Sequence, residues 1–177
     1  ALNLLKNKKA IGMVNGPISK KHFLKNKFLG ITEYLSKKTK SKNQSVMLIY
    51  NTDISVSPIT THLPIKRVPA NLTKVKIIKN IMLLNSFYNK KLKKKPYIAV
   101  LGLNPHCESS ERHSEESRII KPAIKYLKSK KININGPFPA DTIFLKQNIK
   151  KFNLVIGMYH DQVLTPIKSL YEFNAIN

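Results

Sequence analysis

The chain has 177 residues, and 42% of them are hydrophobic, which is enough to fill one sizeable core. Its longest apolar runs fall far short of the roughly 20 residues that cross a bilayer, so we expect no membrane segment. The first residues lack the charged, apolar and small-residue order of a signal peptide, and the chain does not begin with Met. The single cysteine, Cys107, excludes an internal disulfide and fits a reducing cytoplasm.

The composition is strongly basic, with 32 Lys and Arg against 9 Asp and Glu and a net charge of +23. Such a balance is typical of nucleic-acid-binding proteins, because basic side chains neutralise phosphates. Arginine, which binds bases and phosphates bidentately, occurs only at Arg67, Arg112 and Arg118. An excess of lysine with abundant Asn and Ile is what an AT-rich coding sequence favours. We therefore predict no nucleic-acid partner, and a basic nucleic-acid-binding protein remains an alternative.

The first third of the chain predicts three strands and two helices. Residues 10–14 form an apolar run that stops at a turn, which is typical of a strand, and a helix is expected from about Ser19. Residues 32–38 have helical spacing. Residues 46–50 are rich in β-formers and predict a strand, with residues 54–56 as its hairpin partner.

A long amphipathic helix, capped by Asn71, is expected next. Its apolar side chains recur at three- and four-residue intervals and predict one stripe on a lysine-rich cylinder: Leu72, Val75, Ile78 and Met82, with Ile81, Leu84 and Tyr88 alongside. The lysine-rich run at 90–95 predicts a solvated connector, and residues 97–101 predict a buried strand.

The last third predicts a helix over 115–129, a stiff turn over 136–139 and a buried strand over 154–158. Continuous apolar strands that alternate with amphipathic helices indicate an α/β fold, with helices on both faces of a mostly parallel sheet. Nothing in the sequence marks a linker between two complete domains.

Two histidines, His106 and His160, lie just beyond predicted buried strands. Open α/β sheets bind ligands at the carboxyl ends of their strands, and imidazole is the commonest neutral ligand of divalent metals. Asp161 can orient His160 by accepting a hydrogen bond from its second ring nitrogen. His62 is a third candidate, although the spacing does not connect it to the others. A surface or structural role is the alternative for each histidine.

Other candidates carry less information by themselves. Asp141 follows the turn at 136–139 and is either a helix N-cap or a carboxylate aimed at a metal or substrate. Residues 16–20 resemble a strand-turn-helix cradle for an anion. Lys168 is one lysine among many, and His22 and His113 are predicted to face solvent.

Six motifs nevertheless occur in one order: Asn15-Gly16-Pro17-Ile18-Ser19-Lys20, Gly30-Ile31-Thr32-Glu33, Thr61-His62-Leu63-Pro64, Leu103-Asn104-Pro105-His106, Gly136-Pro137-Phe138-Pro139-Ala140-Asp141-Thr142 and Met158-Tyr159-His160-Asp161-Gln162. Together they closely resemble the 4-hydroxythreonine-4-phosphate dehydrogenase family of pyridoxal phosphate biosynthesis, and the last two motifs are highly specific. The resemblance implies a layered α/β/α, two-lobed fold related to isocitrate and isopropylmalate dehydrogenases, which binds NAD without the Rossmann glycine fingerprint. It also implies that residues 1–177 are the central portion of one such enzyme, with N- and C-terminal segments missing.

The resemblance implies roles for particular residues. His62, His106 and His160 match three metal ligands supplied across a homodimer interface. Asp141 matches an acidic residue beside the metal, and we expect it to act in catalysis together with Lys168. The positions that match contacts to the phosphorylated substrate are Thr32, Lys168 and Asn177. The sequence leaves the metal open among Zn, Co, Mn and Mg, although three imidazoles favour the softer transition ions over Mg.

The activity implied is NAD- and metal-dependent oxidation of 4-phosphohydroxy-L-threonine by a cytoplasmic enzyme. Two departures from the family pattern bear on it. Ile31 stands where family members usually have a substrate-contacting histidine, which keeps a sister enzyme acting on 4-phospho-D-threonate or 4-phospho-D-erythronate as an alternative. The loop after His106 is also altered, and Cys107 is a possible thiolate ligand, although adjacent residues on an extended chain point apart. A further alternative is that the chain alone folds poorly and exposes apolar surface.

Overall fold

The computed structural model describes residues 1–16, 18–19, 21–22, 28, 31–39, 45–107 and 113–176, with only the backbone described at Thr32 and Glu33. The chain forms two compact units, Ala1–Ser45 and Val46–Asn177. The first unit contains α1 (Leu2–Lys6) and α2 (Ile31–Lys38). Helix α2 confirms the helix expected over 32–38.

The strand expected over residues 10–14 is wrong. These residues form no strand, and the side chains of Ile11 and Val14 are fully exposed. A strand needs a neighbour that accepts and donates its backbone hydrogen bonds, and no described residue pairs with this run. Residues 18–19 and 21–22 are not helical, and most of the helix expected from Ser19 lies outside the described residues.

The second unit contains a four-stranded sheet in which every pair of neighbours is parallel. The strands follow the order β1-β4-β2-β3, and their bounds are β1 (Ser55–Thr60), β2 (Ile98–Leu101), β3 (Ile134–Phe138) and β4 (Leu154–Tyr159). β2 and β4 confirm the two buried strands expected over 97–101 and 154–158. Both are central in the sheet, which explains their unbroken apolar sequences.

The strand expected over residues 46–50 is wrong, and the strand in this part of the chain is β1 at Ser55–Thr60. Ile49 makes only one antiparallel bridge, to Val56, so the predicted hairpin is reduced to a single pair. β1 is hard to predict from the sequence because it contains Ser57 and Pro58, and proline is uncommon in strands. The buried Ser57 hydroxyl donates to the carbonyl of Met47 at 2.6 Å, and a proline without an N–H is tolerated because β1 is an edge strand.

The turn expected over 136–139 is also corrected, since β3 runs through Gly136 and Pro137 to Phe138. β3 is the other edge strand, where proline is again acceptable. Its register to β2 shifts after Ala99, as in a β-bulge. At the bulge Gly136 has φ +136°, and a Cβ there would overlap the carbonyl oxygen of Val100.

The long helix is α3 (Lys74–Phe87), which continues as a π-helical turn over Tyr88–Leu92. Its cap is Thr73, whose hydroxyl accepts a hydrogen bond from the backbone N–H of Lys76 at 3.2 Å. The predicted cap, Asn71, instead ends a 3₁₀ turn that begins at Pro69, so the α-helix starts later than expected. The lysines at 90–95 are exposed, as expected of a solvated connector.

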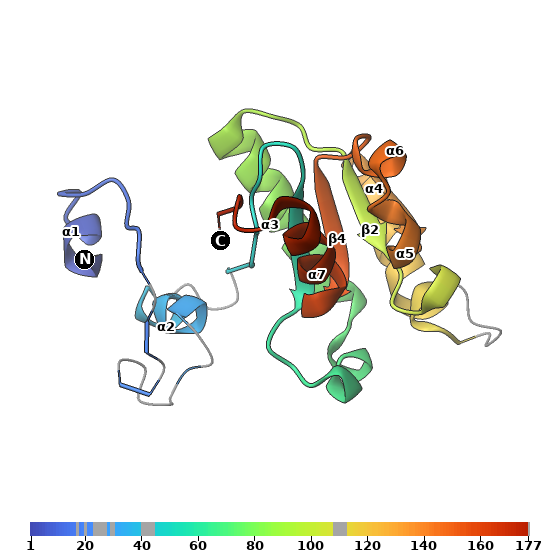
Figure 1. The fold of residues 1–177 in the computed structure, drawn as a ribbon, viewed down its shortest axis with the longest axis horizontal. Coiled ribbons are helices and arrows are strands. Elements are labelled where there is room, and N and C mark those ends of the chain that lie inside the picture. Colours follow the sequence, from blue (N-terminus) through green and yellow to red (C-terminus); the bar gives the residue numbers. More distant parts are fainter. Residues whose placement is uncertain are drawn as a thin grey trace. The chain divides into compact units, whose positions relative to one another are not determined.

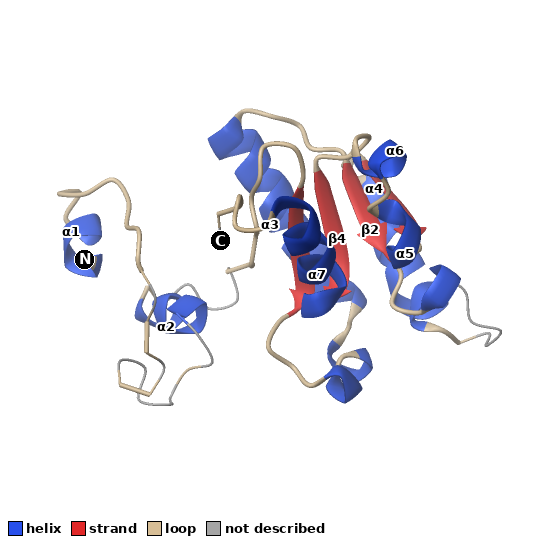
Figure 2. Cartoon of the chain, in the orientation of Figure 1, coloured by secondary structure: helices blue, strands red, loops and turns tan. Residues whose placement is uncertain are grey.

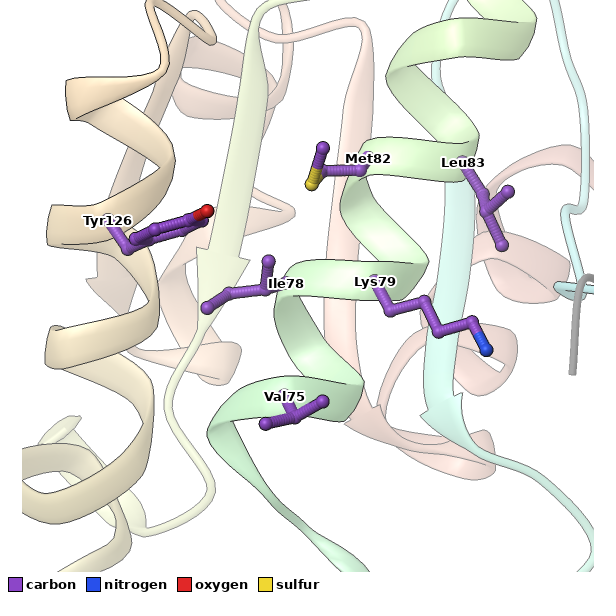
Figure 3. Close-up of a pocket in the computed structure, with 6 residues that line it drawn as sticks. All are labelled: Val75, Ile78, Lys79, Met82, Leu83 and Tyr126. Atoms are coloured by element: carbon purple, nitrogen blue, oxygen red, sulfur yellow. The ribbon is translucent and has the colours of Figure 1, made fainter.

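The predicted apolar stripe of α3 is confirmed in part, since its members Leu72, Ile81, Leu84 and Tyr88 are buried, and is wrong for Val75 and Met82. Ile77, Ile81 and Leu84 are buried, whereas Val75 is 73% and Met82 45% exposed. Figure 3 shows Tyr126 reaching from α4 toward Ile78 and Met82 across an open pocket. Because α3 is apolar on more than one side, the spacing permits two stripes, and packing against the sheet selects one.

The remaining helices are α4 (Lys121–Ser129), α5 (Ala140–Ile143), α6 (Lys146–Ile149) and α7 (His160–Tyr171). A π-helical turn over Glu116–Ile120 leads into α4, which confirms the helix expected over 115–129. Short 3₁₀ turns cover Ile65–Arg67 and Pro105–Cys107. Within the described ranges, no helix is both long and apolar enough to cross a membrane.

Helices cover both faces of the sheet. α3 and α4 lie on one face, and α5, α6 and α7 lie on the other (Figures 1 and 2). Neighbouring strand residues serve opposite cores: Ile98 and Val100 pack with α3 and α4, whereas Ala99 and Leu101 pack with α5 and α7. This arrangement confirms the predicted layered α/β/α fold with a parallel sheet.

Gly136→Ala should destabilise the second unit by at least about 2 kcal/mol, because the new Cβ meets backbone and the positive φ disfavours it. Urea unfolding measures the loss. The matched control is Gly12→Ala, whose Cβ would meet nothing within 4 Å. Equal unfolding midpoints for the two variants would contradict the described bulge.

Candidate functional site

The candidate site lies at the carboxyl edge of the sheet. β1, β2 and β4 are parallel, so their carboxyl ends lie at one edge, the usual ligand-binding edge of an α/β sheet. The segments that leave these three strands carry His62, His106 and His160 respectively.

Two buried side chains join these strand ends. The hydroxyl of Thr60 donates to the carbonyl of Met158 at 2.7 Å, which connects β1 to β4. The Gln162 amide oxygen accepts from the N–H of Met158 at 2.7 Å, and its nitrogen donates to the carbonyl of Gly102 at 2.8 Å. Gln162 therefore connects the end of β4 to the end of β2. Because these bonds are buried, they fix where the following loops begin.

His62 and His160 lie next to each other, with ring centres 5.7 Å apart and ring planes at 37°. Two imidazoles that share one divalent ion have ring centres about 5 Å apart, given metal–nitrogen distances near 2.0–2.1 Å. The pair thus fits two ligands of one cation. The two residues come from positions almost a hundred apart in the chain, and sequence spacing alone did not connect them.

His160 is the first residue of α7, and its Nδ1 lies 2.6 Å from an Asp161 carboxylate oxygen. This contact confirms the predicted pairing of the two side chains. A carboxylate that accepts from one ring nitrogen fixes the orientation of the ring and leaves Nε2 available for a ligand. The Asp161 side chain is 80% exposed. Asp161 also lies in the first turn of α7, where the helix dipole favours a negative charge.

His106 lies in the 3₁₀ turn Pro105–Cys107 and is exposed. The described residues contain no group of three His, Cys, Asp or Glu side chains able to hold a metal. The structure therefore brings His62 and His160 together but does not add His106 to them within one chain.

Two of the three candidate ligands have left-handed backbones, with φ of 49° at His62 and 58° at His106. This conformation is uncommon for a residue with a Cβ and persists only where the surrounding contacts impose it. At His106 the contacts are visible. The Cys107 N–H donates to the Asn104 carbonyl at 3.2 Å and closes the turn around the histidine.

Glu116 fixes the start of that turn. Its side chain is 1% exposed, and one carboxylate oxygen accepts from the backbone N–H groups of Leu103 and Asn104 at 2.7 and 2.8 Å. The other oxygen accepts from the Asn104 side-chain amide at 2.9 Å. Burial opposes the charge, but these hydrogen bonds outweigh it, and the pKa of Glu116 lies below its usual value.

The other predicted site residues that the structure describes lie on three different helices. Asp141 is exposed in the first turn of α5, where Pro139 holds the N-cap position, so the N-cap role is excluded. Lys168 is exposed on α7, two turns or about 12 Å beyond His160. Thr32 lies in α2 in the other unit, and Asn177 lies outside the described residues.

The remaining predictions concern whether the side chains of Cys107, His22 and His113 are buried or exposed. Cys107 is buried beside Gly102, and burial raises the pKa of its thiol, which disfavours a thiolate ligand. His22 and His113 are exposed, as predicted.

Comparison with known proteins gives the family. All 177 residues match the family described as "Pyridoxal phosphate biosynthetic protein PdxA". A 4-hydroxythreonine-4-phosphate dehydrogenase from Sulfurihydrogenibium sp. is 39% identical over 174 residues, covering 96% of this chain and 53% of the relative. The crystal structure of a 4-hydroxythreonine-4-phosphate dehydrogenase from Burkholderia phymatum matches with a TM-score of 0.79 at 29% identity, over 96% of this chain and 52% of that one.

The parallel sheet with two imidazoles at its carboxyl edge places the chain among the layered α/β proteins, whose sheets bind ligands at this edge. The chain belongs to the PdxA family, as the resemblance implied. It spans about half the length of the curated relatives it matches. A relative from Salmonella typhi, 31% identical over 93% of this chain and 51% of its own length, carries the provisional name D-threonate 4-phosphate dehydrogenase.

Sequence inspection missed Glu116 and Gln162 as parts of this edge. Gln162 belongs to the same motif as His160, and a glutamine two residues into a helix gives no signal that its side chain joins two strands. Glu116 lies in a Ser- and Glu-rich segment that resembles a solvated surface. Only the fold reveals that its carboxylate points into the protein.

Glu116→Gln should lower stability at pH 7 by about 1–3 kcal/mol, because hydrogen bonds to a charged group are lost or weakened. The carboxyl pKa is depressed by folding, so its contribution is present above the unfolded pKa, about 4.3, and is lost as pH falls through the folded value. The difference from wild type in urea unfolding should therefore narrow under acid conditions. A gap that stayed constant from neutral to strongly acid pH would contradict this.

Proposed function

We propose that this chain is the central part of a cytoplasmic, NAD- and divalent-metal-dependent dehydrogenase that acts on 4-phosphohydroxy-L-threonine in pyridoxal phosphate biosynthesis. Membership of the PdxA family and the names of the relatives support this activity. The observation that carries the proposal is the His62–His160 pair at the ligand-binding edge of the sheet.

The metal would be held by His62 and His160 of one subunit and by His106 of a second copy. This division supports a homodimer with the active site at the interface, since His106 is exposed and does not complete a ligand set within the described part of its own chain. When bound, the cation supplies positive charge that polarises the substrate, and NAD supplies the hydride acceptor. Zn, Co and Mn suit an imidazole set better than Mg.

The substrate loses two electrons and two protons in all. The hydride leaves the carbon that carries the hydroxyl, the hydroxyl proton leaves to solvent or a base, and the carbon becomes a ketone. The product, 2-amino-3-oxo-4-(phosphooxy)butanoate, is a β-keto acid, which loses CO₂ and takes up a proton to give 3-amino-2-oxopropyl phosphate.

The chain's own residues bind and orient this substrate. Lys168 carries a positive charge on the same helix as His160 and is proposed to bind the phosphate or to handle a proton. Asp141 is proposed to position the substrate beside the metal. Thr32 and Asn177 are proposed as further phosphate contacts, on the strength of the family resemblance.

A second substrate class is supported by one residue. Ile31 begins α2 where a substrate-contacting histidine is usual in the family, and an isoleucine cannot donate a hydrogen bond to the substrate. The Salmonella typhi relative supports the same alternative, oxidation of a phosphorylated sugar acid such as 4-phospho-D-threonate or 4-phospho-D-erythronate.

NADH formation by the full-length protein separates these functions. The assay compares 4-phosphohydroxy-L-threonine, 4-phospho-D-threonate and 4-phospho-D-erythronate, each with and without Zn²⁺, Co²⁺ or Mn²⁺. Metal-dependent NADH from the first substrate alone is the expected result. A preference for either acid without an amino group would assign the sister activity, and no turnover of any of the three would contradict both.

Asp161→Asn should weaken Co²⁺ or Zn²⁺ binding about 10- to 100-fold, because it removes the charge that orients the His160 ring. Isothermal titration measures the affinity. Asp53→Asn is the matched control, because Asp53 precedes β1 at the opposite edge of the sheet. Equal metal affinities for the two variants would contradict the orienting role of Asp161.

A further inference from the structure

We propose that Glu116 is a positioning residue for His106, and that its carboxylate fixes the turn which presents this histidine to the metal of a second subunit. The inference rests on the proposed function, because it assigns Glu116 to the same shared site. It concerns a residue outside the ligand set, at the start of the π-helical turn that leads into α4.

The surroundings of Glu116 indicate a role for its charge. Burying a carboxylate is unfavourable unless hydrogen bonds replace those it makes to water, so a buried Glu is not a neutral way of filling space. Its hydrogen bonds at 2.7, 2.8 and 2.9 Å all come from Leu103 and Asn104, the first residues after the end of β2 and its Gly102. One carboxylate oxygen thus binds two consecutive backbone N–H groups, and the other binds the Asn104 side chain.

That stretch leads directly to His106. Asn104, held by Glu116, accepts the hydrogen bond from Cys107 that closes the turn. Gly102, just before it, is held by the Gln162 amide through its carbonyl and by Phe138 through its N–H. The backbone that leads into the His106 turn is therefore held by hydrogen bonds at each of Gly102, Leu103 and Asn104.

The backbone of His106 requires such a constraint. A left-handed backbone is unfavourable for a residue with a Cβ, and without the surrounding contacts the turn would relax toward ordinary conformations. Relaxation would redirect the imidazole while leaving the sheet intact. Losing the carboxylate should therefore lower the metal affinity, and it should do so only by changing the orientation of His106.

The adjacent Glu115 provides a matched control. Its carboxylate also accepts from the Asn104 side-chain amide, at 3.0 Å, but it is only half-buried and has no bond to the backbone of Leu103 or Asn104 among those described. Glu115→Gln and Glu116→Gln are the same chemical change at neighbouring positions, and only the second should affect the turn.

The experiment titrates Co²⁺ into the full-length protein, with affinity and the visible absorption of the bound ion as readouts. Glu116→Gln should bind Co²⁺ about 10- to 100-fold more weakly than wild type, with an absorption spectrum shifted toward that of His106→Ala. Glu115→Gln should resemble wild type. In the His106→Ala background, Glu116→Gln should cause no further loss, because the two residues act through one ligand.

Amide hydrogen exchange gives a readout without metal. Glu116→Gln should increase exchange at residues 103–107 by a larger factor than in β2 and β4, whose amides respond only to the loss of global stability. If this variant fails to fold, Asn104→Ala, which removes only the side-chain bonds to the carboxylates, should produce the same pattern in weaker form.

Two results would overturn the inference. One is wild-type Co²⁺ affinity in Glu116→Gln, or in Asn104→Ala where that variant replaces it. The other is an equal loss of affinity with and without His106, which would indicate a general structural role. A wild-type protein that binds no Co²⁺ is a distinct outcome, because it contradicts the proposed metal site itself and the inference with it.

Discussion

The site depends on one buried amide, the side chain of Gln162. Parallel strands end with backbone groups that have no further neighbour in the sheet, and buried groups of this kind must find partners. Gln162 supplies partners for two strands at once, accepting from Met158 at the end of β4 and donating to Gly102 just after β2. Since Gln162 itself lies in the first turn of α7, the position of His160 and the start of the His106 turn are set by the same side chain.

The loops beyond this bridge carry the proposed metal ligands. His62 and His106 both have left-handed backbones although neither is glycine, and at His106 the hydrogen bond from Cys107 to Asn104 closes the turn. The two histidines differ in their neighbours, since His62 lies beside His160 in the same chain and His106 joins no group of three possible ligands among the described residues. An exposed histidine that belongs to no group of three possible ligands in the described part of its own chain is what the proposed site shared between two copies requires. The proposal of a homodimer therefore rests on the same edge of the sheet as the proposal of a metal.

Much of this arrangement follows from the sequence, for identifiable reasons. β2 and β4 are central strands, buried on both faces, and their apolar runs place His106 and His160 at the carboxyl edge. The edge strands were misjudged because Pro58 in β1 and Pro137 in β3 are tolerated only where one side of a strand is unpaired. Val75 and Met82 of α3 were misplaced because the apolar residues of this helix lie on more than one side and allow more than one stripe. The proximity of His62 to His160, and the inward direction of Glu116, are tertiary facts that no local pattern encodes.

Subunit mixing tests the central claim, a metal site shared between two copies of the chain. Full-length His106→Ala and His160→Ala variants, each expected to be inactive alone, are dissociated, mixed in equal amounts and reassociated. Half of the dimers should be hybrids, and each hybrid has one site with all three histidines, so about a quarter of the wild-type metal sites and turnover should return. No recovery in hybrids that demonstrably form would contradict the shared site.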